Sequence, residues 1–181
     1  DMIMAKLVKE ADLVKAVSNA DFVVEAVPEI MKIKQKVFEK LGKFSPEHAI
    51  LASNTSTMSI TKIGEHSGKP EKVIGMHFFI PIVILRLIEL IKGEKTTQET
   101  MGISYAVGMK LPALKGKRFI VQIEKESPGF IVNRLTIGGN MYLNCVIDEA
   151  FEKGIPWEDV DADAGDLTQW GPLVKFDFLG L

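Results

Sequence analysis

Two side chains that can exchange protons, His77 and Glu89, lie inside the most apolar stretch of the chain, residues 72–91. Burying a carboxylate is costly unless another group pairs with it. A carboxylate that hydrogen-bonds one imidazole nitrogen fixes the tautomer of the ring and leaves the other nitrogen to accept a proton. The two residues therefore predict either a structural ion pair in the core or a general base that an acid holds in position.

The apolar stretch has to position these two side chains. Its length is close to that of a membrane-spanning helix, but a proline and several charged residues interrupt it. Two buried strands over residues 73–78 and 85–91, joined by a turn, explain the pattern better. We therefore expect no membrane span, and a hairpin between these strands could bring His77 and Glu89 together.

Small polar residues, including Asn54 and Ser56, follow a third predicted strand over residues 49–53. In open α/β sheets, ligands bind at the carboxyl ends of the strands. The segment is therefore a candidate binding loop, although a loop that only caps the next helix would have the same composition.

Glu29 and Lys34 follow the predicted strand over residues 21–27 in the same way. From their spacing alone, an exposed ion pair on a helix is the better interpretation of these two residues. Asn133 is a polar amide among apolar residues in the first turns of a long predicted helix. Its side chain needs a hydrogen-bond partner, which could be only the backbone.

Strands and helices alternate along the chain up to about residue 123, which indicates an α/β fold with a largely parallel sheet. Several strands follow one another without long helices after Val73, so we expect the sheet to become mixed there. The predicted strands are residues 21–27, 49–53, 73–78, 85–91 and 118–123. The predicted helices are residues 12–18, 28–42, 59–65 and 97–109.

The composition changes at residues 124–129 (EKESPG), which are charged and then turn-forming. We predict a domain boundary here, with one domain over residues 1–124 and a second over residues 125–181. The Ser127-Pro128 pair can cap and begin a helix, so we expect a long helix over about residues 130–153. A second helix is expected to follow it.

Composition excludes several classes of protein. The 181 residues carry a net charge of -2, and the lack of basic excess argues against nucleic acid as a main partner. Cys145 is the only cysteine, which excludes a disulfide framework and favours a reducing compartment, for which we expect the cytoplasm. Alternating aspartates from Asp159 onward are typical of a calcium loop, but Ala164 and Trp170 replace its glycine and glutamate. No metal site is predicted.

Five stretches in sequence order resemble the L-3-hydroxyacyl-CoA dehydrogenases of fatty-acid β-oxidation. They are VVEAVPE at 23–29, ASNTS at 52–56, GMHFFIP at 75–81, LIELI at 87–91 and SPGFIVNRL at 127–135. The GPL and FDFLGL stretches near the end of the chain also resemble the family. The resemblance implies a partial Rossmann-type NAD-binding domain, followed by the start of an all-helical C-terminal domain.

The resemblance also implies a reaction, the oxidation of an L-3-hydroxyacyl-CoA to the 3-ketoacyl-CoA with NAD as cofactor. His77 corresponds to the catalytic base that takes the proton of the 3-hydroxyl, and Glu89 to the acid that orients it. Ser56 and Asn133 correspond to groups that hydrogen-bond near the 3-oxygen of the substrate and the nicotinamide.

Further positions of the family contact the two ligands. Glu29 and Lys34, together with Ser56, correspond to residues on the nicotinamide half of the cofactor, and Asn54 to a residue along the acyl-CoA. Members of the family are homodimers through the helical domain, and the chain could also belong to a fusion with an enoyl-CoA hydratase. A non-catalytic relative used as a structural or assembly module is the alternative.

The chain departs from the family pattern in two places. The family motif reads HFFNP, and Ile80 stands in place of its asparagine, so one polar contact beside the proposed base is expected to be missing. The family also begins with a strand, a glycine-rich turn and a helix, and no G-x-G-x-x-G follows a predicted strand here. The site for the pyrophosphate and adenosine is therefore expected to be absent from these residues.

Overall fold

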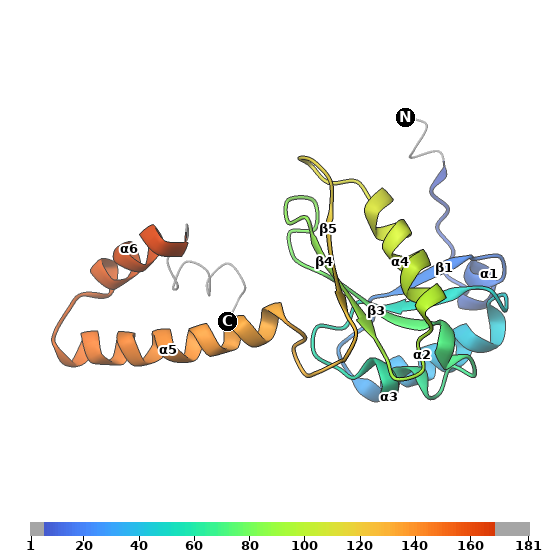
Figure 1. Ribbon diagram of the computed structural model, residues 1–181, viewed down its shortest axis with the longest axis horizontal. Helices are drawn as coiled ribbons and strands as arrows, with labels where there is room; N and C mark the ends of the chain where they lie inside the picture. Colours follow the sequence, from blue (N-terminus) through green and yellow to red (C-terminus); the bar gives the residue numbers. More distant parts are fainter. Residues whose placement is uncertain (1–5, 169–181) are drawn as a thin grey trace. The chain divides into compact units, whose positions relative to one another are not determined.

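Five short strands form one sheet in the order β1-β2-β3-β4-β5 (Figure 1). The computed structural model describes residues 6–168 of the chain. The strands are β1 (Phe22–Glu25), β2 (Ile50–Ser53), β3 (Val73–Phe78), β4 (Leu87–Lys92) and β5 (Phe119–Ile123). β1, β2 and β3 are parallel, β4 is antiparallel to β3, and β5 is parallel to β4. The predicted α/β class and the predicted change to a mixed sheet after Val73 are both confirmed.

Helices cover both faces of this sheet. They are α1 (Leu13–Val17), α2 (Met31–Phe44), α3 (Ile60–Gly64) and α4 (Gln98–Lys110), and a 3-10 turn, η2 (Pro70–Lys72), precedes β3. Side chains of Asp12, Ser59 and Thr97 accept hydrogen bonds from the first turns of α1, α3 and α4. The predicted start of a helix at Pro28 is wrong, because the N–H of Ile30 donates to the carbonyl of Pro28 in a turn before α2.

Alternate side chains of the strands enter two separate apolar cores. Figure 1 shows α4 on one side of the sheet and α2 and α3 on the other. The core on the α4 side includes Met76 and Leu90, and the opposite core includes Val73 and Ile91. Because side chains alternate along a strand, His77 and Glu89 share the face of Val73 and Ile91, next to α3.

Gly75 allows α3 to pack closely on this face of β3. A β-carbon at Gly75 would lie 2.8 Å from a side-chain carbon of Ile60 in α3 and 2.9 Å from Cβ of Ile91 in β4. Only a residue without a side chain fits between these neighbours. His77 lies two residues further along the same strand, near the carboxyl end of β3.

The segment after β5 leads to two further helices, α5 (Val132–Glu152) and α6 (Trp157–Thr168). The long helix predicted over about residues 130–153 is confirmed as α5, Val132–Glu152. The Ser127-Pro128 pair does not begin it, because Gly129 and Phe130 adopt positive φ angles of 74° and 51°. A glycine with positive φ, Gly154, follows α5, as expected for a helix end.

The chain divides into two units, residues 1–133 and 134–181. The domain boundary expected at residue 124 stays a prediction for the complete protein. The GPL and FDFLGL stretches lie outside the described residues. No helix within residues 6–168 is both long enough and apolar enough to cross a membrane.

Candidate active site

The antiparallel pairing of β3 and β4 brings His77 and Glu89 directly opposite each other. Nδ1 of His77 lies 2.8 Å from Oε2 of Glu89, and the two residues are 4% and 0% exposed. Directly opposite residues on adjacent strands are close enough for their side chains to interact. The predicted proximity of the two side chains is therefore confirmed, while their roles stay a prediction.

The second carboxylate oxygen of Glu89 binds the start of α5. Oε1 accepts hydrogen bonds from the backbone N–H groups of Ile131 and Val132, at 3.1 and 3.0 Å. Phe130, which precedes these two N–H groups, has a positive φ, and its buried phenyl ring lies 5.7 Å from the ring of His77. A residue outside the usual backbone regions persists only where its surroundings hold it. Glu89 therefore serves both the histidine and the helix start.

The protonation state of Glu89 determines the tautomer of His77. Burial alone would raise the pKa of Glu89, but the hydrogen bond from His77 and the N–H groups at the start of α5 lower it by more. The pKa of Glu89 therefore lies below its ordinary value, and the side chain is a carboxylate that can only accept hydrogen bonds. In neutral His77 the proton must then lie on Nδ1, and Nε2 is the nitrogen that can accept a proton.

Ser56 and Asn133 lie together beside this pair. Nδ2 of Asn133 donates a hydrogen bond of 3.3 Å to the backbone carbonyl of Ser56, and Asn133 follows Val132, which is bound to Glu89. The alternative that Asn133 has only a backbone partner is the observed one. The contact nevertheless joins the first turn of α5 to the loop after β2, so the two polar residues are neighbours of the dyad.

Asn54 fixes the end of the strand that carries the histidine. Its Oδ1 accepts a hydrogen bond of 2.9 Å from the N–H of Phe78, and its own N–H donates to the carbonyl of Glu25 at the end of β1. Through its side-chain oxygen and its backbone N–H, Asn54 therefore ties together the carboxyl ends of β1, β2 and β3. This is the edge of a sheet at which α/β proteins bind their ligands.

Lys34 is buried, and the interpretation of Glu29 and Lys34 as an exposed helical pair is wrong. Nζ of Lys34 lies 2.8 Å from Oε1 of Glu25 and 3.1 Å from Oε2 of Glu29, and Lys34 is only 1% exposed. Oε1 of Glu29 in turn accepts hydrogen bonds from the hydroxyl of Thr55 and the N–H of Ser56. Two carboxylates from the β1 region thus hold one ammonium.

The hydrogen bonds also determine the charge of Glu29. Burial alone would raise its pKa, but the hydrogen bonds from Thr55, Lys34 and the backbone of Ser56 lower it by more, so the pKa lies below the ordinary value. Glu29 is therefore an anion that holds the Ser56 loop in place.

Glu25 belongs to this network, although the sequence analysis did not select it. Its carboxylate accepts hydrogen bonds from Lys34, from the hydroxyl of Ser53 at 2.7 Å and from the N–H of Val27 at 2.6 Å. The signal that pointed to Glu89, an acid inside an apolar strand, is present here as well, in the stretch FVVEAV. The same argument applied to Glu25 would have predicted a buried partner for it.

Ile80 lies in the loop that joins β3 to β4 and is 72% exposed. The ring of the preceding residue, Phe79, is tilted against the ring of His77, with the two centroids 4.5 Å apart. An aliphatic side chain at position 80 offers neither a donor nor an acceptor. The loop that follows His77 therefore carries no side-chain hydrogen-bonding group at position 80.

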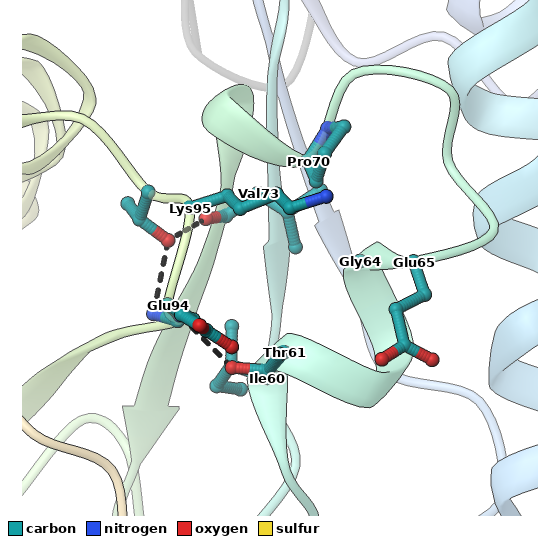
Figure 2. Close-up of a pocket in the computed structure, with 10 residues that line it drawn as sticks. Ile60, Thr61, Gly64, Glu65, Pro70, Val73, Glu94 and Lys95 are labelled. Carbon is teal, nitrogen blue, oxygen red and sulfur yellow. Dashed lines mark hydrogen bonds between the residues drawn. The ribbon is translucent and has the colours of Figure 1, made fainter.

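A small cavity lies away from the dyad, at the amino end of β3. Figure 2 shows its lining, which includes Thr61 of α3, Val73 at the start of β3 and Glu94 after β4. Its volume is about 70 Å³, far below the several hundred cubic ångströms of ordinary ligand sites. The hydroxyl of Thr61 accepts from the N–H of Glu94, and that of Thr96 donates to the carbonyl of Val73. These groups serve packing rather than a ligand.

No group of three or more His, Cys, Asp or Glu side chains within the described part of the chain is arranged to hold a metal ion. Proton transfer between an imidazole and a substrate needs no metal. The arrangement around His77 can therefore act chemically as a base held by a carboxylate.

Comparison with known proteins gives consistent matches. Residues 1–121 match the family model described as "3-hydroxyacyl-CoA dehydrogenase, NAD binding domain". The chain is 34% identical over 185 residues to the mitochondrial hydroxyacyl-coenzyme A dehydrogenase of Homo sapiens, a match that covers 98% of this chain and 54% of the human protein. It is 37% identical over 168 residues to the fatty acid oxidation complex subunit alpha of Idiomarina loihiensis, covering 92% of this chain and 22% of that subunit.

A solved structure has the same fold. The (S)-3-hydroxybutyryl-CoA dehydrogenase of Ralstonia eutropha superimposes with a TM-score of 0.76 at 32% identity, over 88% of this chain and 54% of that one. The chain thus spans about half the length of the human relative and of this structure.

Proposed function

Because the chain belongs to the 3-hydroxyacyl-CoA dehydrogenase family and matches its NAD-binding domain, we propose that the complete protein oxidises L-3-hydroxyacyl-CoA to 3-ketoacyl-CoA with NAD, in fatty-acid β-oxidation. The observation that carries the proposal is the buried pair of His77 and Glu89, with Nδ1 and Oε2 2.8 Å apart. The pair leaves Nε2 of the ring as the basic atom.

Each polar residue of the site has a role in this proposal. Nε2 of His77 takes the proton of the 3-hydroxyl, and the carboxylate of Glu89 stabilises the imidazolium that forms. Ser56 and Asn133 hydrogen-bond the 3-oxygen, on which negative charge develops as its proton leaves. In the reverse direction protonated His77 donates the proton to the same oxygen. Asn54 lies along the acyl-CoA while its amide oxygen fixes the end of β3.

The residues at the carboxyl ends of β1 and β2 fit the nicotinamide half of NAD. Glu29 has a side chain that is 41% exposed and is held by Lys34, so it presents a fixed acceptor at this edge. Glu29 and Ser56 would hold the nicotinamide half, and buried Lys34 would support it through Glu29. When bound, NAD supplies the acceptor for the hydride that leaves C3.

The proposal is tested with the complete protein, acetoacetyl-CoA and NADH. We expect NADH to be consumed in proportion to 3-hydroxybutyryl-CoA formed, with formation of the L (S) enantiomer. NADH binding without turnover of any 3-ketoacyl-CoA would contradict the proposed activity and support a non-catalytic structural or assembly module.

Ile80 is the observation that favours this second candidate, because it removes a polar group beside the dyad. If the protein is an enzyme, Ile80→Asn is expected to raise kcat about tenfold, the scale of one added hydrogen bond in a transition state. Steady-state kinetics with acetoacetyl-CoA check this result. The matched control is Ile103→Asn, which replaces an exposed isoleucine of α4. A variant with unchanged or lower kcat would mean that the site does not lack a polar contact at position 80.

The proposals for partners rest on the family assignment, and the proposal for the compartment rests on the cysteine. We propose an acyl-CoA substrate and a homodimer formed through the helical domain. A fusion with an enoyl-CoA hydratase is supported by the match to a much longer fatty acid oxidation complex subunit. The single cysteine, Cys145, is free and exposed, which supports our proposal of a reducing compartment such as the cytoplasm.

A further inference from the structure

Arg118, immediately before β5, is a buried cation that the dehydrogenase reaction does not use directly. It is only 5% exposed, and its Nη1 donates hydrogen bonds of 2.8 Å to the carbonyls of both Ile82 and Leu85. Its Nη2 donates a bond of 2.5 Å to the carbonyl of Pro112. Within the described part of the chain it forms no ion pair, and its Nε has no hydrogen-bond partner.

An arginine buried without a carboxylate indicates that backbone carbonyls alone compensate its charge. The guanidinium is planar and carries donors in a fixed fork, so it can bind several carbonyl oxygens in one geometry. Two of the three carbonyls belong to the loop between β3 and β4, residues 79–86. Arg118 therefore specifies where this loop lies relative to the segment between α4 and β5.

Burial of its own side chains does not hold the loop. Ile80 and the four aliphatic residues from Ile82 to Leu85 are exposed, so they add little packing energy. Besides the hydrogen bonds of Arg118, backbone hydrogen bonds connect the loop to the segment between α4 and β5 and to the first residue of β5. The N–H of Leu114 donates to the carbonyl of Val83, and the N–H of Phe119 donates to the carbonyl of Arg86.

The loop joins the two strands that carry the dyad. It follows His77 on β3 and precedes Glu89 on β4, and the ring of its first residue, Phe79, contacts the ring of His77. The ladder between β3 and β4 keeps His77 opposite Glu89 whether or not the loop moves. A shift of the loop would instead move Phe79 and Ile80 relative to the imidazole, and so change the wall of the site beside the base.

We propose that Arg118 is a positioning residue for the dehydrogenase reaction, because its guanidinium holds residues 79–86 as a fixed wall beside His77. The inference rests on the proposed function. It adds a residue just before β5, distant in sequence from the dyad, whose effect on turnover passes through backbone carbonyls.

The test compares variants of the complete protein in steady-state kinetics with acetoacetyl-CoA and NADH. Arg118→Met keeps the length of the side chain and removes every donor. We expect its kcat to fall about tenfold, because a displaced wall beside the imidazole misplaces the bound substrate, and a misplacement of about 1 Å can cost up to about 10²-fold. The KM for NADH is expected to stay unchanged, because the proposed cofactor residues Glu29 and Ser56 follow β1 and β2 and do not belong to this loop. Arg118→Lys, which keeps the charge but not the fork, should recover part of the loss.

Lys69→Met is the matched control for general destabilisation. Lys69 is also a buried cation, and within the described part of the chain its ammonium hydrogen-bonds only to carbonyls, those of Ser45 and Pro46 after α2. It is not part of the site. We expect it to lower the thermal midpoint as Arg118→Met does, but to keep kcat well below that midpoint. Hydrogen exchange should accelerate at the N–H groups of Ile84 and Leu85 in Arg118→Met alone.

Three outcomes separate the possibilities. Wild-type kcat in Arg118→Met would overturn the positioning role while leaving the proposed function intact. An equal loss of kcat in Lys69→Met would assign the effect to lost stability and would also overturn it. Absence of turnover in the wild-type protein would overturn the proposed function and this inference with it.

Discussion

Replacing His77 with alanine in the complete protein is expected to lower kcat about 10²- to 10⁴-fold, the usual contribution of a general base. Nε2 of His77 is the atom that the proposal assigns to the proton of the 3-hydroxyl, and Glu89 cannot reach that proton because both of its oxygens are engaged. The KM for NADH should change little. Steady-state kinetics in both reaction directions provide the measurement.

His48→Ala is the matched control for this variant. His48 is an exposed histidine that is paired with Asp21 at the surface, so its loss should leave kcat unchanged. If His77→Ala turned over at the wild-type rate while remaining folded, the base would have to be another group, and the dyad would be a structural ion pair.

Removing Glu89 is expected to damage both turnover and stability. Glu89→Ala leaves His77 and the N–H groups of Ile131 and Val132 without their partner, and breaking a buried pair in this way costs about 3–5 kcal/mol. Glu89→Gln should cost less, because an amide oxygen can still accept from the start of α5. Glu89→Gln should nevertheless lower kcat strongly, because a neutral amide does not stabilise the imidazolium as the carboxylate does. Urea unfolding and kinetics on both variants measure the two effects separately.

The pH dependence of the unfolding free energy tests whether the charge of Glu89 is what stabilises the folded protein. The pKa of Glu89 is lowered in the folded protein, so its contribution to stability is present above the unfolded value of about 4.3 and is lost as the pH falls through the folded value. The difference in unfolding free energy between wild type and Glu89→Gln should therefore shrink on acidification. A difference that stayed constant or grew would indicate that the carboxylate charge is not what stabilises the pair.

The sequence was sufficient to predict the contact between His77 and Glu89, for a physical reason. Two adjacent apolar runs separated by a short turn form an antiparallel hairpin. An acid and a histidine on the buried faces of its strands can then pair, which offsets the cost of burying the carboxylate. The mixed sheet followed from the order of the strands. Both predictions depend on strands that follow one another along the chain, whose pairing a sequence pattern can reveal.

Predictions failed where the decisive contact lies between elements that no local pattern pairs. The Ser127-Pro128 pair is a good local signal for a helix start, yet α5 begins at Val132 because Glu89 satisfies its first N–H groups from another strand. Lys34 lies on an amphipathic helix, and only the fold brings Glu25 and Glu29 together around it. Arg118 is one of several basic residues near β5, and nothing local distinguishes it.

The central claim is that the 3-oxygen of a hydroxyacyl-CoA meets His77. The most direct test is a crystal structure of the complete protein with NAD and a bound 3-ketoacyl-CoA. We predict that the 3-oxygen lies within hydrogen-bond reach of Nε2 of His77, about 2.6–3.2 Å away, with Ser56 and Asn133 beside it. A bound substrate whose 3-oxygen lies out of reach of Nε2, with the His77–Glu89 contact unchanged, would contradict the account.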